Sequence, residues 1–369
     1  MVAEGDVQMN FGGRIQYDVG FNSADNSLKN PSGMFPGFSY GDSTEFRRAR
    51  FGASGTLDEA VSFKAEYDFA NTDGVGFTDV YMQLGTPYGK IRVGHFLEPF
   101  SLSGTTGSKF LVFEERALTA TFAPVRNSGI MLHDSAAGDS VSWALGVFRG
   151  VDSESTATDS SYSWTSRLTW APKHDKETGD LVHLALASSV RSAVENKIRY
   201  KNSGENHFNP SLADVTVDNS DGAVLYGVEA GWVSGPLYVH AEYVMSSVSQ
   251  ESGAGAGADF GAYSVEAGFF LTGEHRPYKS GMFGRITPNS IYGKGGNGAV
   301  ELAARYGSLD LNDGAFSGGE LTDTLLGVNW YLNPNAKIQC NLVHSELEDR
   351  AGVPDGDTDA LLLRFHVDF

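Results

Sequence analysis

The sequence has one cysteine, few prolines and no long apolar run. Cys340 alone excludes an intrachain disulfide and a cysteine-based zinc site. With 12 Pro, and 45 Gly scattered without a repeat, the chain is neither collagen-like nor of low complexity. No segment approaches about 18 consecutive apolar residues, so no transmembrane helix is predicted. The start, MVAEGDVQMN, lacks the apolar core of a signal peptide, and we expect a mature chain with an added or trimmed start.

Basic residues are also in short supply. The 27 Lys and Arg stand against 46 Asp and Glu, which gives a formal net charge of −19 and excludes a general nucleic-acid-binding protein. The nine His are scattered, and no Gly-x-Ser-x-Gly segment is present. The segment DGDTD (355–359) alternates carboxylates as a calcium loop does, but it lacks the downstream Glu, so we expect a solvated loop. The sequence therefore predicts no enzyme, no cofactor and no metal site.

Alternating apolar and polar residues recur along the whole chain, and helical spacing is scarce. In the last nine residues, LLLRFHVDF, every second residue from Leu361 to Phe369 is apolar and lies on one side of an extended strand. Such a stripe is unexpected in a chain whose mean hydropathy is −0.23. The same period appears in about sixteen segments. Their approximate ranges are 7–20, 44–57, 60–70, 77–86, 89–97, 127–135, 140–149, 161–171, 181–191, 223–233, 236–248, 260–272, 298–308, 321–332, 336–346 and 359–369.

Tight and long connections alternate between these segments. The tight ones are TLDEA, TPYGK, AAGDS, VSGPL and NPNAK, and the long polar ones are 21–43, 98–126, 150–160, 192–222, 249–259, 309–320 and 347–358. This is the layout of an outer-membrane barrel, whose apolar stripes face lipid while polar residues face a wet lumen. Closure leaves no strand edge unpaired. We predict an all-β fold, a transmembrane antiparallel β-barrel of 16 strands with inward-folded loops, formed by one domain over 1–369.

A soluble β-sandwich would show the same alternation, with its apolar face turned inward. Two features favour the barrel. A sandwich needs no systematic difference between the connections at its two ends. The apolar faces also carry aromatic residues near strand ends, as the interfacial girdles of membrane proteins do. These residues are Trp164, Trp170, Trp232, Trp330 and Tyr331.

Several stretches resemble the phosphate-selective porins, the O and P porins of Gram-negative bacteria. They are FGGRIQYD, EFRRARFGASGT, IRVGHFLEPFSL, GSKFLVFEERALT, FLTGEHRPYK and LLGVNWYLNPNAKI, in order from residue 11. The resemblance covers nearly the whole chain. It implies a homotrimer of sixteen-stranded barrels in the outer membrane, in contact with its lipid and lipopolysaccharide. It also implies a pore narrowed by the third and fifth outer loops and by one inward connection, here 98–126, 192–222 and 273–297.

The resemblance also implies a set of residues that bind small anions such as phosphate. A loop lysine in the family motif matches Lys109 in GSKF, and the hydroxyl of Ser108 lies beside it in the sequence. The family's lining arginines and its ladder of alternate arginines supply the other matches, which are Arg14, Arg47, Arg48, Lys197, Arg199 and Lys201. Two of the three ladder positions are Lys, a point charge where Arg offers a planar fork. A broader anion range, including carboxylates or sulfate, therefore stays open.

Each of these residues also has a structural interpretation. Lys109 could be a solvated loop lysine, and Arg14 could only pair with Asp18 or Glu66. Adjacent residues of a regular strand point to opposite faces, so Arg47 and Arg48 can both face the lumen only if the strand is bulged. Three charged residues of the third loop could hold it by ion pairs, and one acid could tune Lys109. These residues are Glu114, Glu115, Arg116 and, as the tuning acid, Asp79.

The distribution of charge matters more than its sum. The region SELEDRAGVPDGDTD (345–359) holds six carboxylates and one Arg, and GVDSESTATDSS (150–161) holds three carboxylates and no base. In contrast, 273–297 holds four bases and one Glu. Exposed loop charges are screened beyond about 8–10 Å, whereas the local field governs ion traffic in a narrow lumen. Three functions stay open: an anion-selective porin, a general or cation-preferring diffusion porin, and a non-conducting barrel that serves as a scaffold or adhesin.

Overall fold

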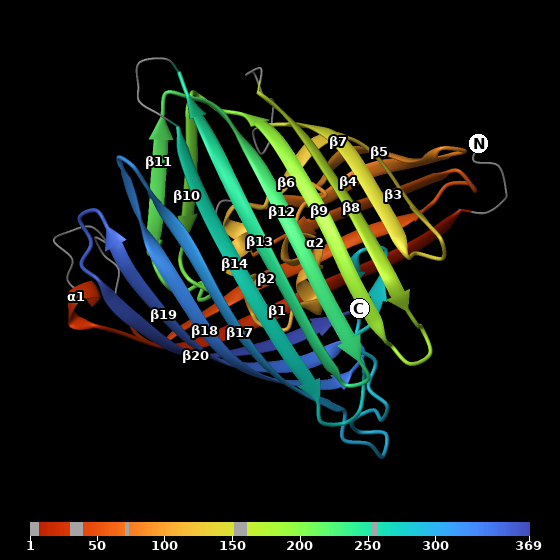
Figure 1. Ribbon diagram of the computed structural model, residues 1–369. Helices are drawn as coiled ribbons and strands as arrows, with labels where there is room; N and C mark the ends of the chain where they lie inside the picture. Colours follow the sequence, from red (N-terminus) through yellow and green to blue (C-terminus); the bar gives the residue numbers. More distant parts are fainter. Residues whose placement is uncertain (1–6, 30–39, 71–73, 151–160, 252–256) are drawn as a thin grey trace.

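The computed structural model describes residues 7–29, 40–70, 74–150, 161–251 and 257–369. Within these residues, sixteen antiparallel strands close into a barrel (Figure 1), which confirms the predicted fold class. β20 pairs with β1 and completes the closure, with Val367 opposite Ile15. The barrel strands are β1 (Gln8–Ala24), β2 (Ser43–Thr56), β3 (Val61–Asp68), β4 (Gly76–Thr86), β5 (Gly89–Leu97), β6 (Arg126–Ala136), β7 (Val141–Arg149), β8 (Tyr162–His174), β9 (Leu181–Ser192), β12 (Ser220–Ser234), β13 (Leu237–Gln250), β14 (Ala258–Phe270), β17 (Ala299–Asp313), β18 (Phe316–Asn333), β19 (Ala336–Arg350) and β20 (Gly356–Asp368).

The helices are short, as the scarcity of helical spacing predicts. They are α1 (Asn26–Lys29), α2 (Leu102–Thr105) and two 3₁₀ turns, Ser108–Phe110 and Leu118–Thr121. Among the described residues, no helix has the length and apolar character needed to cross a membrane.

Two predicted outer loops are shorter than expected. Residues 314–315 alone join β17 to β18, where we predicted a loop over 309–320, and residues 351–355 join β19 to β20, where we predicted 347–358. The strands continue because backbone pairing needs no apolar side chain: Asn312 lies opposite Ser317 beyond the apolar band. The acidic segment 151–160 and residues 1–6 lie outside the described residues.

The two faces of the wall follow the predicted alternation. Outward residues such as Phe11, Trp164 and Leu186 leave 57–65% of their surface exposed, whereas inward polar residues such as Gln16 are buried. Tyr331 is a correction, because this predicted girdle residue is buried and its hydroxyl donates to Glu301 at 2.8 Å. It is one residue beyond Trp330, so it takes the other face of β18.

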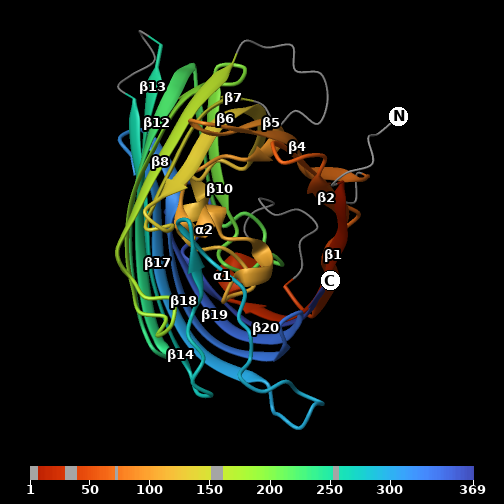
Figure 2. The same ribbon diagram turned by 90° about the vertical axis from the view of Figure 1, so that its right-hand side faces the viewer.

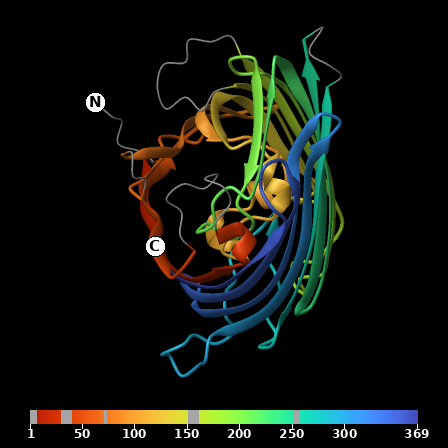
Figure 3. The same ribbon diagram turned by 90° about the vertical axis from the view of Figure 1, so that its left-hand side faces the viewer.

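Three segments fold into the barrel, at the places where 98–126, 192–222 and 273–297 were predicted to do so (Figures 2 and 3). The first carries α2 and both 3₁₀ turns. The second forms a hairpin of β10 (Lys197–Asn202) and β11 (Ala213–Asp218), and the third contains β15 (Tyr278–Lys279) and β16 (Met282–Phe283). Their apolar side chains pack on the inner surface of the strands from β12 to β20, for example Val217 of β11 in one cluster and Phe113 in another.

Candidate functional site

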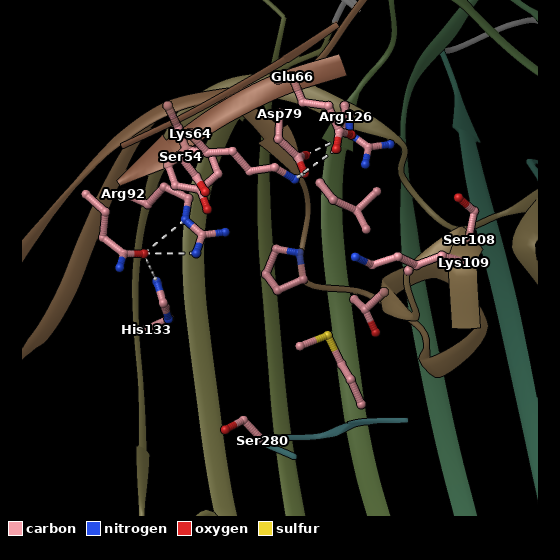
Figure 4. Close-up of a pocket in the computed structure, with 18 of the residues that line it drawn as sticks. Ser54, Lys64, Glu66, Asp79, Arg92, Ser108, Lys109, Arg126, His133 and Ser280 are labelled. Atoms are coloured by element: carbon pink, nitrogen blue, oxygen red, sulfur yellow. Dashed lines mark hydrogen bonds and ion pairs between the residues drawn. The ribbon is translucent and has the colours of Figure 1, made fainter. Parts of the chain in front are cut away.

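A cavity of about 900 Å³ lies in the lumen between the strands from β1 to β8 and the inward segment 98–125 (Figure 4). It extends to Lys279 and Ser280 of the inward connection. Its lining contains three carboxylates, on Glu66, Asp79 and Asp134. Against these stand eleven bases, which are Arg14, Arg48, Arg50, Lys64, Lys90, Arg92, Lys109, Arg116, Arg126, Arg167 and Lys279.

Lys109 projects from the 3₁₀ turn Ser108–Phe110 into this cavity (Figure 4). Its Nζ lies 3.4 Å from Asp368 Oδ2, and a third of its side chain stays exposed. Asp368 also accepts from Arg285 of the inward connection at 3.0 Å. Burial lowers the pKa of the Lys109 ammonium from its ordinary value; Asp368 opposes this, and Arg285 and Arg14 add to it. The structure therefore brings two inward segments together around one shared carboxylate.

Arg14 and Ser108 meet, although they lie 94 positions apart. The guanidinium donates to Ser108 Oγ at 2.7 Å and to Glu66 Oε2 at 3.1 Å. Of the two pairings considered for Arg14, the structure contains the one with Glu66. Asp18 instead accepts from the buried Arg364 at 2.7 Å. Arg14 thus both fixes the loop and lines the cavity.

The Arg47–Arg48 pair faces the lumen because β2 is bulged. Gln16 lies opposite Arg48 and Tyr17 lies opposite Phe46, so Arg47 is the extra residue. Arg48 lines the cavity and donates to Gln16 Oε1 at 2.8 Å. Arg47 forms a bidentate pair with Glu115, at 2.8 and 3.1 Å.

Glu115 and Glu114 fix segment 98–125 in different ways. Burial alone would raise the pKa of Glu115, but Arg47, Arg48 and Arg364 hold it well below its usual range. Glu114 makes no ion pair among the described residues; its backbone N–H donates to Asn341 Oδ1 at 2.9 Å. The predicted ion pairing is therefore present for Glu115 and wrong for Glu114, which contributes a backbone hydrogen bond instead.

The predicted ladder lies on the exposed face of β10. Arg199 forms a bidentate pair with Asp214 of β11, at 2.9 and 2.6 Å. Lys197 lies 3.4 Å from Asp218, and Lys201 is opposite Asp214 in the strand register. The three basic side chains do lie in a row on one face of β10. Acids on the neighbouring strand compensate much of their charge. The role of the ladder in capturing anions stays a prediction.

Asp79 also lines the cavity, but its partners are not the predicted one. It accepts from Lys64 at 2.6 Å and from Arg126 at 2.8 Å (Figure 4). The carboxylate that contacts Lys109 is Asp368. Within the described residues, Asp79 therefore neutralises two wall bases and has no contact with Lys109.

Further residues of the barrel strands complete the site, and the sequence did not single them out. Lys90 and Arg92 alternate on β5, which places them on one face, and strand phase alone could have indicated this. A row of buried acids on β12, β13, β14, β17 and β18 was also missed, and Glu242 and Asp323 of this row bond distant loops that strand alternation cannot indicate. This row is Glu229, Glu242, Glu266, Glu301 and Asp323.

One cluster of possible metal ligands lies away from the lumen. Side-chain ligand atoms of His344, Glu346 and Asp357 lie within 4.8 Å of one another on β19 and β20. His344 already bonds Asp359 at 2.8 Å and Glu346 at 3.2 Å. These contacts account for the arrangement without a metal.

Comparison with known proteins gives a consistent result. The model of the family described as phosphate-selective porin O and P matches residues 9–369. An uncharacterized protein of Caulobacter vibrioides is 31% identical, over 96% of this chain and 72% of that protein. Porin O of Pseudomonas aeruginosa is 25% identical, over 96% of this chain and 88% of its own length.

Solved structures agree on the fold. An anion-selective porin from Comamonas acidovorans has a TM-score of 0.58 at 12% identity, over 98% of this chain and 100% of that one. OmpT of Vibrio cholerae, in its trimer form, has a TM-score of 0.55 at 13% identity, over 98% and 100%. At these identities both likenesses show the fold alone.

Proposed function

Because the chain belongs to the phosphate-selective porin O and P family, we propose that this outer-membrane porin is an anion-selective diffusion channel for phosphate or a similar small anion. The match of the family model to residues 9–369 confirms the family resemblance found in the sequence. The protein is located in the bacterial outer membrane. Family and fold indicate a channel rather than an enzyme.

One observation carries the proposal: the lumen cavity is basic in a chain that is strongly acidic. Eleven bases and three carboxylates line it, whereas the whole chain has a net charge of −19. A permeating ion responds to the charges of the narrow passage, because charges on the exterior are separated from it by solvent and screened. The lining therefore favours anions over cations.

Lys109 and its neighbours supply the groups that an anion needs in the lumen. An anion that loses part of its water requires donors in exchange, and a fixed positive charge offsets part of the desolvation. Lys109, Arg14 and Arg48 bring charge and N–H donors to one cavity. Their ion pairs with Asp368 and Glu66 moderate the field, which keeps binding weak enough for exit.

A general or cation-preferring diffusion porin is the competing function. Its support is a set of carboxylates that lie opposite one another at the outer ends of three neighbouring strands, Asp310, Glu320 and Glu348, of which Glu320 is half-buried. A plugged scaffold or adhesin has less support, because the lumen holds a cavity of about 900 Å³. We also propose a homotrimer in contact with outer-membrane lipid and lipopolysaccharide, supported by the trimer form of the OmpT fold relative.

The test is the reversal potential of the purified protein in planar bilayers under a salt gradient. Anion selectivity places this potential on the side of the anion equilibrium potential, and inorganic phosphate then reduces the chloride current. A potential at the cation side supports the competing function. Absence of conductance from a correctly folded barrel supports the scaffold.

A further inference from the structure

The connection between β14 and β17 has two parts, which lie on opposite sides of the barrel wall. The first part lies in the lumen, where Phe283 is buried and Arg285 donates to Asp368 Oδ1 at 3.0 Å. The second part, residues 289–298, lies outside the ring of strands (Figures 2 and 3), and we call it the external turn. Lys294, one of the four bases of the predicted inward connection, belongs to the external turn and does not line the lumen cavity.

A buried carboxylate fixes the point where the chain leaves the lumen. Glu274 is buried, and its Oε1 atom accepts from the backbone N–H of Asn289 at 2.8 Å. The Asn289 side chain also donates to the carbonyl oxygen of Thr272 at 3.3 Å. Both partners lie in the short stretch that follows β14, so the two ends of the connection are joined at the short-turn end of the wall. The external turn therefore begins at a fixed position.

The external turn packs on an outward aromatic residue of β18. Trp330 shares the outward face of this strand with the exposed Val328. The ring of Tyr292 meets the Trp330 ring nearly edge-on, with 5.1 Å between ring centres. The Trp330 indole N–H donates to the carbonyl oxygen of Asn297 at 2.7 Å. The backbone N–H of Tyr292 donates to a carbonyl oxygen of β18 at 2.9 Å, so both side-chain and backbone contacts hold the turn against the outer surface.

The backbone of the turn is also closed on itself. The N–H of Lys294 donates to the carbonyl oxygen of Ile291 at 3.1 Å. Gly298 has a φ of +79°, and a Cβ at this position would lie 2.4 Å from the carbonyl oxygen of Tyr331. Only glycine lets the chain pass this close to β18 in this conformation. The turn therefore has a defined shape and a defined place on the wall.

The residues of this turn are those that favour the boundary between hydrocarbon and headgroups. Trp330 lies close to the end of β18 at the short-turn side, and Tyr292 leaves 54% of its surface exposed. Trp and Tyr gather at membrane–water interfaces because an apolar ring carries a polar N–H or O–H group. Lys294 is exposed and is the only charged residue in the sequence from 287 to 298. A lysine at this level reaches the phosphates of the lipid headgroups with its ammonium group.

We propose that the external turn is a membrane-contact surface that binds phospholipid headgroups through Lys294 and the aromatic pair Tyr292–Trp330. The ammonium donates to phosphate oxygens of the leaflet at the short-turn end, and the two rings lie against the adjoining glycerol and upper acyl carbons. Lipid contact then tethers the connection whose other part reaches Asp368 through Arg285. This role goes beyond conduction, and it does not depend on which ions the channel prefers.

The experiment locates the external turn relative to the lipid by fluorescence quenching. Cys340→Ser removes the single native cysteine, and Asn297→Cys then carries a fluorophore on the turn while Lys294 and Tyr292 stay unchanged. The full chain is reconstituted in vesicles of phosphatidylethanolamine and phosphatidylglycerol that contain a phospholipid with a nitroxide on its headgroup. Lys279→Cys is the matched control, because Lys279 lies in the same connection but lines the lumen.

The headgroup nitroxide should quench the label at 297 and leave the label at 279 unquenched. A nitroxide deep in the acyl chain should quench the label at 297 less than the headgroup nitroxide does. An unquenched label at 297, or stronger quenching from the deep nitroxide, overturns the proposal. Relief of the quenching by inorganic phosphate in the buffer would assign the turn to free phosphate and overturns it as well. Heat-resistant migration on gels verifies that each variant forms a barrel.

Lys294→Gln tests the charge separately from the aromatic contact. With nitroxide-labelled phosphatidylglycerol, an anionic lipid, association with the labelled turn should fall by about fivefold, because one lysine near an anionic surface contributes that much. Lys176→Gln is the control, since Lys176 lies in the exposed turn between β8 and β9 at the same end of the barrel. Unchanged quenching in Lys294→Gln overturns the assignment of Lys294 to the headgroup phosphate. The reversal potential in a salt gradient, which tests the proposed function, should be the same in this variant and the parent.

Discussion

The two halves of the barrel wall use charge in opposite ways. The strands from β1 to β8 present bases to an open cavity, while Glu242 of β13, Glu266 of β14 and Asp323 of β18 are buried acids that bond inward segments. Glu242, for example, accepts from the backbone N–H of Leu102 at 3.0 Å and from the hydroxyl of Thr119 at 3.0 Å. The acids of the second half hold the segments that shape the lumen, and the bases of the first half face what passes through it.

This contrast explains how an acidic chain can have a basic passage. A carboxylate that already accepts hydrogen bonds from a loop adds little to the field felt by a solute, because its charge is compensated locally. Glu266 is bonded by Arg276 at 3.0 Å and by Arg305 at 3.0 Å, and Arg305 also bonds Glu205. Net charge sums over groups that differ in this respect, so it does not indicate selectivity.

The largest effect should come from reversing the charge of the inward loop. Replacing Lys109 with Glu places a carboxylate beside Asp368, and the anion-to-cation permeability ratio should fall by at least about tenfold, which corresponds to about 1.4 kcal/mol. The measurement is the reversal potential in a salt gradient. Lys173→Glu carries the same charge change outside the cavity lining and should leave the ratio unchanged. A parental ratio in the Lys109 variant would show that Lys109 lies outside the ion path.

The second effect should come from releasing segment 98–125 from Glu242 of β13. Glu242→Ala leaves the N–H of Leu102 and the hydroxyl of Thr119 without their acceptor, at a cost of about 2 kcal/mol to loop docking. Single-channel conductance should rise and become noisier, and anion preference should fall. Glu251→Ala, at the exposed outer end of β13, is the control. Unchanged conductance in Glu242→Ala would mean that other contacts hold the loop alone.

These two residues also show what sequence reasoning can reach. Lys109 was accessible through the resemblance of GSKF, and the alternation of period two indicated the strands and their faces. For the adjacent pair Arg47–Arg48, alternation left open whether both face the lumen, because that requires a bulge, and the bulge is present. Glu242 could not be assigned, because its partners lie 123 and 140 positions away and alternation says nothing about which loop covers which strand.

A smaller effect is expected from the ladder on β10. Replacing Lys197, Arg199 and Lys201 with Gln should reduce anion conductance modestly, by less than about twofold, because Asp214 and Asp218 already compensate them. The effect should appear at low salt and vanish at high salt. The opposite change, Asp214→Asn with Asp218→Asn, should raise anion conductance at low salt. A decrease in this double variant would contradict the compensation.

The last effect concerns folding stability rather than selectivity, and it depends on pH through Glu114. Burial raises the pKa of Glu114 to about 8 from its ordinary 4.5, and its Oε1 atom has no hydrogen-bond partner among the described residues. The folded state therefore retains a proton that the unfolded chain loses. This contribution to stability is complete below pH 4.5 and is lost as the pH rises through 8. Thermal unfolding in detergent should show a midpoint that falls between pH 5 and 9, and Glu114→Gln should flatten this dependence.

Because of the bulge, Arg47 is not needed to keep the inward and outward alternation of the other side chains of β2. Phe46 points outward with 60% of its surface exposed, and Arg48 points inward, so Arg47 sits between two residues that already alternate correctly. Deleting Arg47 would leave all the remaining side chains of β2 on their present faces. Deleting a residue from a regular stretch of the strand would instead move the side chains on one side of the deletion to the opposite face. The extra residue thus gives the lumen an added side chain that holds Glu115 of the inward segment, at no expense to the surface that meets the membrane.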